Sequence, residues 1–404
     1  MQKKLIIIGW FCICSLSAEP ILEKFLLSFS EYQSLKNIEA KQEIFAENGF
    51  NKTLIEKARF NVGYSRFDKE NIDVAFELRL YPKTFSQIDK EEEIYNLSKN
   101  RVDISYENTK SKALKRHYDL LINTNFQKKS YQNMQNLLDI NKRQLDLALS
   151  VTDSVTDVIN LAKIKKRVQK IEYSLLKKKQ KYYNNLLKIR QYIPDVDIEK
   201  IDNAFEKRAF ISVQEIISFI NKNKNDFNKT SLKFLEKEQI EVLLAKDKME
   251  LSKIADGFHI NSIDLKYENE NVFKKSLSVG LSLEKTWSGS NILKSVNEKI
   301  KFLDAQNKLN KKEEDLKYQI LSIMKEIDIL NSNILYAKES IENDSFFQAY
   351  QEFKNSDPLK LLVFENNHLE IKRNLIKTKK ELYSKFIDLL YRTNNLTINS
   401  LLKK

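Results

Sequence analysis

Glycine, proline, cysteine and histidine are all scarce in this chain. Its 404 residues include six glycines, four prolines, two cysteines and three histidines. So few helix breakers indicate long uninterrupted elements. Both cysteines, Cys12 and Cys14, stand near the N-terminus. A chain that has lost this first segment therefore has no disulfide, no thiol nucleophile and no cysteine ligand for zinc.

Signatures of catalysis are missing as well. The sequence has no Gly-rich phosphate loop, no G-x-S-x-G motif and no H-E-x-x-H motif. His117, His259 and His368 are far apart in the sequence, and a packed or solvated histidine is commoner than a metal ligand. We therefore expect no enzyme: no catalytic residues, no cofactor and no metal site.

Residues 1–18 have the order of a cleaved secretory signal peptide. Lys3 and Lys4 precede an apolar run that ends at Cys14, and small residues follow up to Ala18. This is the arrangement that export signals share, and the apolar run is too short to cross a bilayer as a helix. We expect the protein to be exported. Whether Cys14 carries a lipid stays open.

The chain is basic, with a formal charge of +13 from 69 Lys and Arg against 56 Asp and Glu. Such a balance can attract nucleic acid or an anionic membrane. Here, however, lysine and glutamate interleave, as in residues 90–93 and 311–314, which is typical of a solvated helical face. Together with export, this pattern leads us to expect no nucleic-acid partner.

Four segments alternate apolar and polar residues, the pattern of β-strands with one apolar face. They span residues 59–67, 72–80, 258–267 and 277–285. In the third segment the alternation changes phase at Ser262, which predicts a β-bulge. The outward apolar residues are the candidates for contact with lipid: Phe60, Val62, Tyr64, Val74, Phe76, Leu78, Val279, Leu281 and Leu283.

Two interpretations of these strands stay open. Segments of this length, with one apolar and one polar face, suit a membrane β-barrel around a wet lumen. A soluble sheet that lies on a protein core would alternate in the same way. Two hairpins cannot close a barrel within one chain, so the first interpretation requires several chains.

Long stretches with helical periodicity flank the strand pairs. An apolar ladder from Leu293 to Leu303 steps by three and four residues, as in a coiled coil. A helix of about 65 residues extends roughly 100 Å, which is far more than a globular domain needs. The predicted long helices span residues 84–149, 157–192, 290–352 and 358–402.

The order of these elements occurs twice. A strand pair, a long helix, a polar break and a returning helix fall in residues 19–192 and again in residues 213–404. Self-similarity of this kind indicates an internal structural repeat. Residues 193–212 are the expected linker between the two repeats.

These segments resemble the TolC-type outer-membrane efflux proteins. Leu277–Gly289 is similar to the family's alternating strand followed by an aromatic residue and glycine, and Val74–Pro82 is its counterpart. Thr152–Ile159 is similar to the family's polar turn, and Ser356–Leu362 matches it more loosely. The resemblance covers nearly the whole chain after residue 18 and rests on the order of elements. The family's usual glycine at the helical tip is missing here.

The resemblance implies a mostly α-helical homotrimer with a small membrane β part, in which a twelve-stranded β-barrel tops an α-barrel tunnel of antiparallel coiled-coil helices. It implies contact with outer-membrane lipid, a long periplasmic part, and work with a periplasmic adaptor and an inner-membrane transporter. The implied function is a passive exit duct for small molecules or proteins in a tripartite efflux or type I secretion system. The alternative is an exported coiled-coil protein that scaffolds the envelope or binds a partner without forming a pore.

Three aspartates at the polar breaks, Asp153, Asp157 and Asp357, are candidate tunnel-tip or gating residues. Repeated around a trimer axis, such carboxylates could form a ring that binds cations. Helix capping is the alternative, since Asp357 stands directly before Pro358, an arrangement that suits an N-cap.

Two aromatic residues, Tyr81 and Trp287, stand where a predicted strand gives way to a helix. Such residues often anchor a protein at the membrane interface. Packing at the junction between sheet and helices would explain them equally well.

Overall fold

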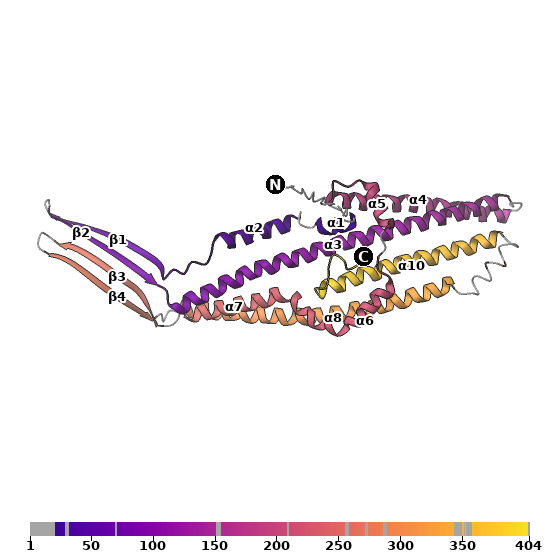
Figure 1. Ribbon diagram of the computed structural model, residues 1–404. Coiled ribbons are helices and arrows are strands. Elements are labelled where there is room, and N and C mark those ends of the chain that lie inside the picture. The colour runs from indigo at the N-terminus through magenta and orange to yellow at the C-terminus, as the bar shows by residue number, and fades with distance from the viewer. Residues whose placement is uncertain are drawn as a thin grey trace, which may run out of the picture.

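The protein is elongated, with a β-sheet at one end and long helices that run to the other (Figure 1). The computed structural model describes residues 21–28, 32–68, 71–150, 155–207, 210–254, 258–270, 274–285, 289–342, 350, 352 and 358–402. Short helices thicken the middle of the molecule, where the C-terminus also lies. The fold is mostly helical, with one small antiparallel sheet.

The sheet contains four strands in the order β1-β2-β3-β4. Every neighbouring pair is antiparallel, including β2 and β3, which come from distant parts of the chain. The register shift that the sequence predicts at Ser262 lies between Ile260 and Ser262. Each strand extends past its expected bounds: β1 (Ile55–Asp68), β2 (Asn71–Pro82), β3 (Phe258–Glu270) and β4 (Lys274–Lys285).

Four long helices form the body of the molecule. The largest, α3, has 66 residues, which corresponds to about 100 Å at 1.5 Å per residue. It begins where Thr84 accepts a hydrogen bond from the backbone N–H of Gln87 (3.2 Å), and no glycine or proline interrupts it. The four are α3 (Phe85–Ser150), α4 (Val155–Tyr192), α8 (Gly289–Glu342) and α10 (Pro358–Arg392).

Five shorter helices lie in the part of the chain that the structure describes. One of them, α5, lies within residues 193–212, which the sequence led us to treat as a linker. Its apolar residues Ile201 and Phe205 are buried in the core, and this packing, more than local propensity, explains the helix. The five are α1 (Ile21–Leu27), α2 (Gln33–Glu47), α5 (Ile198–Lys207), α6 (Val213–Phe234) and α7 (Glu236–Ile254).

The main hydrophobic core lies in the middle of the molecule. Helices α1, α5 and α6 pack there against the long helices, and Tyr118, Ile189 and Phe386 are among its fully buried residues. Leu401 and Leu402 return to the same core from the C-terminal segment. The short helices thus cover apolar side chains that a thin layer of long helices would leave exposed.

The predicted helix 358–402 is wrong at its C-terminal end, because α10 stops at Arg392. Asn394 has a positive φ of 54°, and its N–H bonds to the carbonyl of Tyr391 (3.1 Å). The N–H of Asn395 bonds to the carbonyl of Leu390 (2.8 Å). This is a Schellman end, a conformation that asparagine tolerates better than most residues.

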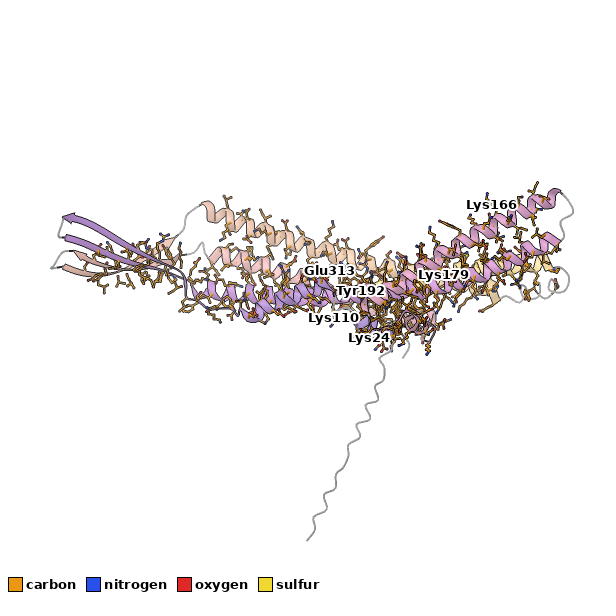
Figure 2. The ribbon with its side chains drawn as sticks, turned by 90° about the horizontal axis from the view of Figure 1, so that it is seen from above. Lys24, Lys110, Lys166, Lys179, Tyr192 and Glu313 are labelled. Carbon is orange, nitrogen blue, oxygen red and sulfur yellow. The ribbon has the colours of Figure 1, made fainter. Side chains whose placement is uncertain are left out.

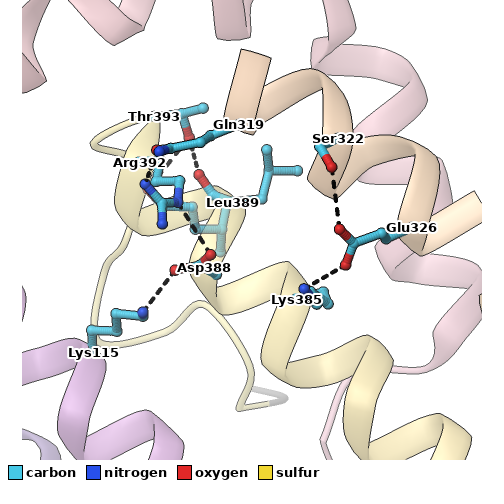
Figure 3. A network of polar contacts seen from close by, with 10 residues as sticks. Lys115, Gln319, Ser322, Glu326, Lys385, Asp388, Leu389, Arg392 and Thr393 are labelled. Carbon is cyan, nitrogen blue, oxygen red and sulfur yellow. Dashed lines mark hydrogen bonds and ion pairs between the residues drawn. The ribbon is translucent and has the colours of Figure 1, made fainter. Parts of the chain in front are cut away.

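A polar network ties the end of α10 to its two neighbours (Figure 3). Asp388 pairs with Lys115 of α3 (2.7 Å) and with Arg392 (3.1 Å), while Lys385 pairs with Glu326 of α8. Burial alone would raise the pKa of Asp388, but the two cations outweigh it and the pKa lies below its ordinary value. The network therefore fixes α10 between α3 and α8.

Candidate functional site

The four strands place their apolar residues on one face of the sheet. Phe60 lies opposite Leu78, Leu78 opposite Leu265, and Leu265 opposite Val279, and directly opposed residues share a face. All nine candidate lipid-facing residues occupy this set of register positions. The same register places further apolar residues on this face, among them Leu80, Ile260, Ile263, Leu265, Tyr267 and Leu277.

This apolar face is exposed. Leu277 is 75 % exposed, Val279 69 % and Phe60 62 %. A soluble sheet that lay on a protein core would bury these side chains. The interpretation of the strands as such a sheet therefore does not fit the single chain. A large exposed apolar patch marks a surface that meets a membrane or another protein. Contact of these residues with lipid stays a prediction.

The opposite face carries a polar network across three strands. The Nε of Arg79 in β2 lies 2.7 Å from Oδ1 of Asp264 in β3, and its Nη2 lies 2.8 Å from Oε1 of Glu77. Asn61 of β1 donates a hydrogen bond to the other oxygen of Glu77 (3.0 Å). The wall of a membrane β-barrel around water would have two such faces, and closure of a barrel stays a prediction.

Both edges of the sheet are open. Within the described residues, β1 pairs only with β2 and β4 only with β3. These edge strands have 14 and 12 residues, so each presents a long row of unpaired backbone groups. Such an edge is a template for a strand of another chain.

The outermost long helices are α4 and α8. Toward the end far from the sheet, α3 lies between α4 and α10, and α10 lies between α3 and α8. Lys166 and Lys179 mark the course of α4 there (Figure 2). Among the described large apolar residues, α3 and α10 expose only Phe85, Leu149 and Val363.

The two outer helices, by contrast, expose many apolar side chains. Tyr173 of α4 is 70 % exposed and Tyr336 of α8 is 75 % exposed. The ladder from Leu293 to Leu303, expected to form a coiled-coil seam, is also exposed in the single chain. Others on these two helices are Val158, Ile159, Leu176, Tyr183, Leu187, Tyr318, Leu321, Ile329 and Leu335.

Of the candidate tip aspartates and interface aromatic residues, only Asp157 and Tyr81 lie within the described residues. Asp153, Asp357 and Trp287 lie outside the described residues. Asp157 belongs to the first turn of α4. Tyr81 is half-buried at the junction of β2 with α3 and has the Nζ of Lys57 5.9 Å from its ring centre. Their roles at a gate or a membrane interface stay predictions.

The described part of the chain contains no cluster of metal-ligating side chains and no membrane-spanning helix. No three or more histidine, cysteine, aspartate or glutamate side chains come together there in a way that could hold a metal ion. None of the described helices combines the length and the apolar character needed to cross a membrane.

Comparison with known proteins points to one fold. No family model and no curated protein matches the sequence. The open-state outer-membrane channel MtrE of Neisseria gonorrhoeae matches with a TM-score of 0.67 and 10 % identity, over 94 % of this chain and 91 % of that one. The outer-membrane protein VceC of Vibrio cholerae gives 0.67 and 9 %, over 92 % and 95 %.

A third solved structure agrees. It is CusC, whose crystal structures concern the conformational changes that accompany folding and transmembrane channel formation. CusC matches with a TM-score of 0.66 and 9 % identity over 92 % of this chain and 91 % of that one. At such identities the likeness is one of fold. The resemblance that the sequence predicts is confirmed at that level: the chain has the fold of the TolC-type outer-membrane channels.

Proposed function

We propose that this protein is an outer-membrane channel that assembles from three copies of the chain. The observation that carries the proposal is the open four-stranded sheet, apolar and exposed on one face and polar on the other, joined to long helices of which α3 extends about 100 Å. In this arrangement the two strand pairs of each chain, one from each of two internal repeats, lie in the membrane, and the helices extend the duct into the periplasm.

The sheet supports assembly because its two edges need partners. When β1 of one copy pairs with β4 of the next, three copies contribute twelve strands and no edge remains. The apolar face then meets lipid, and the network of Arg79, Asp264 and Glu77 faces the lumen. A barrel of this size encloses an aqueous channel.

The helices support the same assembly. Exposed apolar residues gather on α4 and α8, the two outer helices, whereas α3 and α10 between them expose few. When α4 of one copy packs against α8 of the next, the exposed ladders become coiled-coil seams. The strands around the barrel and the helices around the tunnel then follow one another in the same direction. A barrel that continues into a tunnel requires this.

Transport through this duct is passive. The protein works with an inner-membrane transporter that supplies energy and with a periplasmic adaptor that joins the two, as in tripartite efflux or type I secretion. Export through a cleaved signal peptide in residues 1–18 brings the chain to the outer membrane. The chain has no enzymatic role in this scheme.

Planar-bilayer recording tests the proposal. Purified mature protein should give discrete conductance steps in a bilayer, and its detergent-solubilised particle should contain three chains. A control protein lacking residues 55–82 and 258–285, the four strands, should give no steps. A wild-type protein that stays monomeric in detergent and conducts no ions would contradict the proposal and favour an envelope scaffold without a pore.

A further inference from the structure

A cavity of about 650 Å³ lies between the long helices and the start of α6. Its lining comes from α3, α8 and α10, and from Ser212, Val213 and Gln214 at the start of α6. The volume is that of a site for an organic molecule of moderate size. The cavity is lined by residues of the helices and by Ser212 just before α6, and by none of the four strands.

Four lysines line this cavity and no carboxylate does, among the described residues. Lys129 comes from α3, Lys338 from α8, and Lys372 and Lys379 from α10. None of the four forms an ion pair with a described residue, although lysine and glutamate are interleaved elsewhere in the chain. Lys338 and Lys379 are half-buried, so water screens them less than it screens a surface lysine.

The charges of this cluster act on one another. The pKa of Lys379 is lowered by its burial and then by the nearby charges of Lys338 and Lys129. On the other side of α10, Lys178 likewise has a lowered pKa from burial and from neighbouring cations. Like charges that repel one another at a half-buried site cost stability unless an anion compensates them.

One carboxylate stands close to the rim. Glu215, in the first turn of α6, accepts a hydrogen bond from the backbone N–H of Ser212, as the third helical residue of a capping box does. It raises the pKa of Tyr383 through its charge, an effect that is secondary to the burial of that tyrosine. It does not line the cavity, so the four lysines share the lining with no carboxylate of the described residues.

The rest of the wall is part apolar and part polar. Phe126 and Tyr383 are buried, and Leu375 and Ile376 pack against the main core. Amide side chains of Gln132, Asn133 and Asn136 offer further hydrogen bonds. A bare ion would leave most of this cavity unused, whereas an anion that carries an aromatic or aliphatic group would fill it.

We propose that this cavity is a binding site for an amphipathic organic anion, with a doubly charged head such as a phosphate monoester held by Lys338 and Lys379 and an apolar group held against Phe126 and Leu375. Phosphate accepts hydrogen bonds from lysine as a point charge. All of the residues that line the site come from one chain, so the site does not require a second copy.

Calorimetric titration of the detergent-solubilised full-length mature protein with 1-naphthyl phosphate tests the site. We expect saturable binding that weakens as salt is added, because the head is held by charge. Inorganic phosphate has the charged head without the apolar group, and neutral 1-naphthol has the apolar group without the charge. Both should bind more weakly than the probe.

Two variants and one matched control make the test specific. Lys338→Gln and Lys379→Gln should each weaken binding about tenfold, without loss of thermal stability, since each removes a repelled charge. Lys325→Gln, an exposed lysine of α8 outside the cavity, should bind like the wild type. The proposal is overturned if the probe does not saturate, if the two variants bind as the control does, or if they instead destabilise the oligomer, which would mean that another copy compensates the lysines.

Discussion

His117 is a histidine that is almost completely buried in the main core. It belongs to α3, is 1 % exposed, and stacks on Phe25 of α1 with ring centroids 4.4 Å apart. Tyr192 and Tyr32 complete the aromatic cluster at 4.7 and 5.6 Å. The cluster joins the N-terminal segment to the long helices, so its protonation state bears on the stability of the middle of the molecule.

Replacing His117 by phenylalanine should remove a pH dependence of stability. Burial lowers the pKa of His117 to about 4 from an ordinary 6.5. The unfolded chain then binds the proton more readily, so stability is full above about pH 6.5 and is lost as pH falls toward 4, by roughly 2 kcal/mol between pH 7 and pH 5. Melting temperatures of wild type and His117→Phe at both pH values measure the difference. Equal losses on acidification in the two proteins would contradict this role.

The end of α10 depends on one residue in the left-handed region. Asn394→Gly should leave stability unchanged or raise it slightly, because glycine adopts positive φ without strain. Asn394→Val should cost about 1 to 2 kcal/mol, since a β-branched side chain is strained there. Thermal melts of the two variants decide this, and a valine variant as stable as the glycine variant would show that the end of α10 is not held by this conformation.

At the scale of elements, the sequence predicted what local periodicity encodes. The alternation from Ile72 to Leu80 is strong because only one face of the strand is polar, and α3 is readable because no glycine or proline interrupts it. The end of α10 was missed because Leu396, Leu401 and Leu402 continue an apolar pattern. Those leucines instead return to the core after the turn at Asn394.

Other elements could not be read from local patterns. The pairing of β2 with β3 joins residues such as Leu78 and Leu265, and nothing near either strand in sequence specifies it. Helix α5 is short, and it owes its stability to the burial of Ile201 and Phe205 against neighbours distant in the chain. The exposure of the apolar ladder that begins at Leu293 likewise could not be predicted from the sequence, because it depends on how the helices of the whole chain pack.

The two faces of the sheet should respond differently to charge. Val279 and Ser278 are neighbours in β4 whose side chains lie on opposite faces. A lysine at Val279 would enter lipid and should cost about 2 to 4 kcal/mol if it lies near the mid-plane of the bilayer, whereas Ser278→Lys faces the lumen and should be tolerated. The fraction of each variant that folds into vesicles measures this. Equal insertion of both would mean that the apolar face does not meet lipid.

At the scale of the whole molecule, a threefold assembly would turn single charges into rings. Replacing Asp153, Asp157 or Asp357 by asparagine should leave stability nearly unchanged, because asparagine caps helices as well as aspartate. If the carboxylates line a constriction, at least one replacement should alter single-channel conductance and weaken block by divalent cations. If conductance and cation block stay unchanged in all three variants, these aspartates act only as helix caps.

The central claim is that three copies close one barrel through β1 and β4. The only cysteines lie at Cys12 and Cys14, so cysteines introduced into the mature chain report contacts without background. A series would combine Val62→Cys in β1 with Leu277→Cys, Val279→Cys or Leu281→Cys in β4, and each double variant would be oxidised in the membrane.

At least one of these pairs should yield covalent species of two and three chains and none larger, because a closed ring of three leaves no free edge. The same cysteines introduced singly should give no trimer. A ladder that continues beyond three chains, or protein that stays monomeric with every pair, would contradict the closed three-chain barrel.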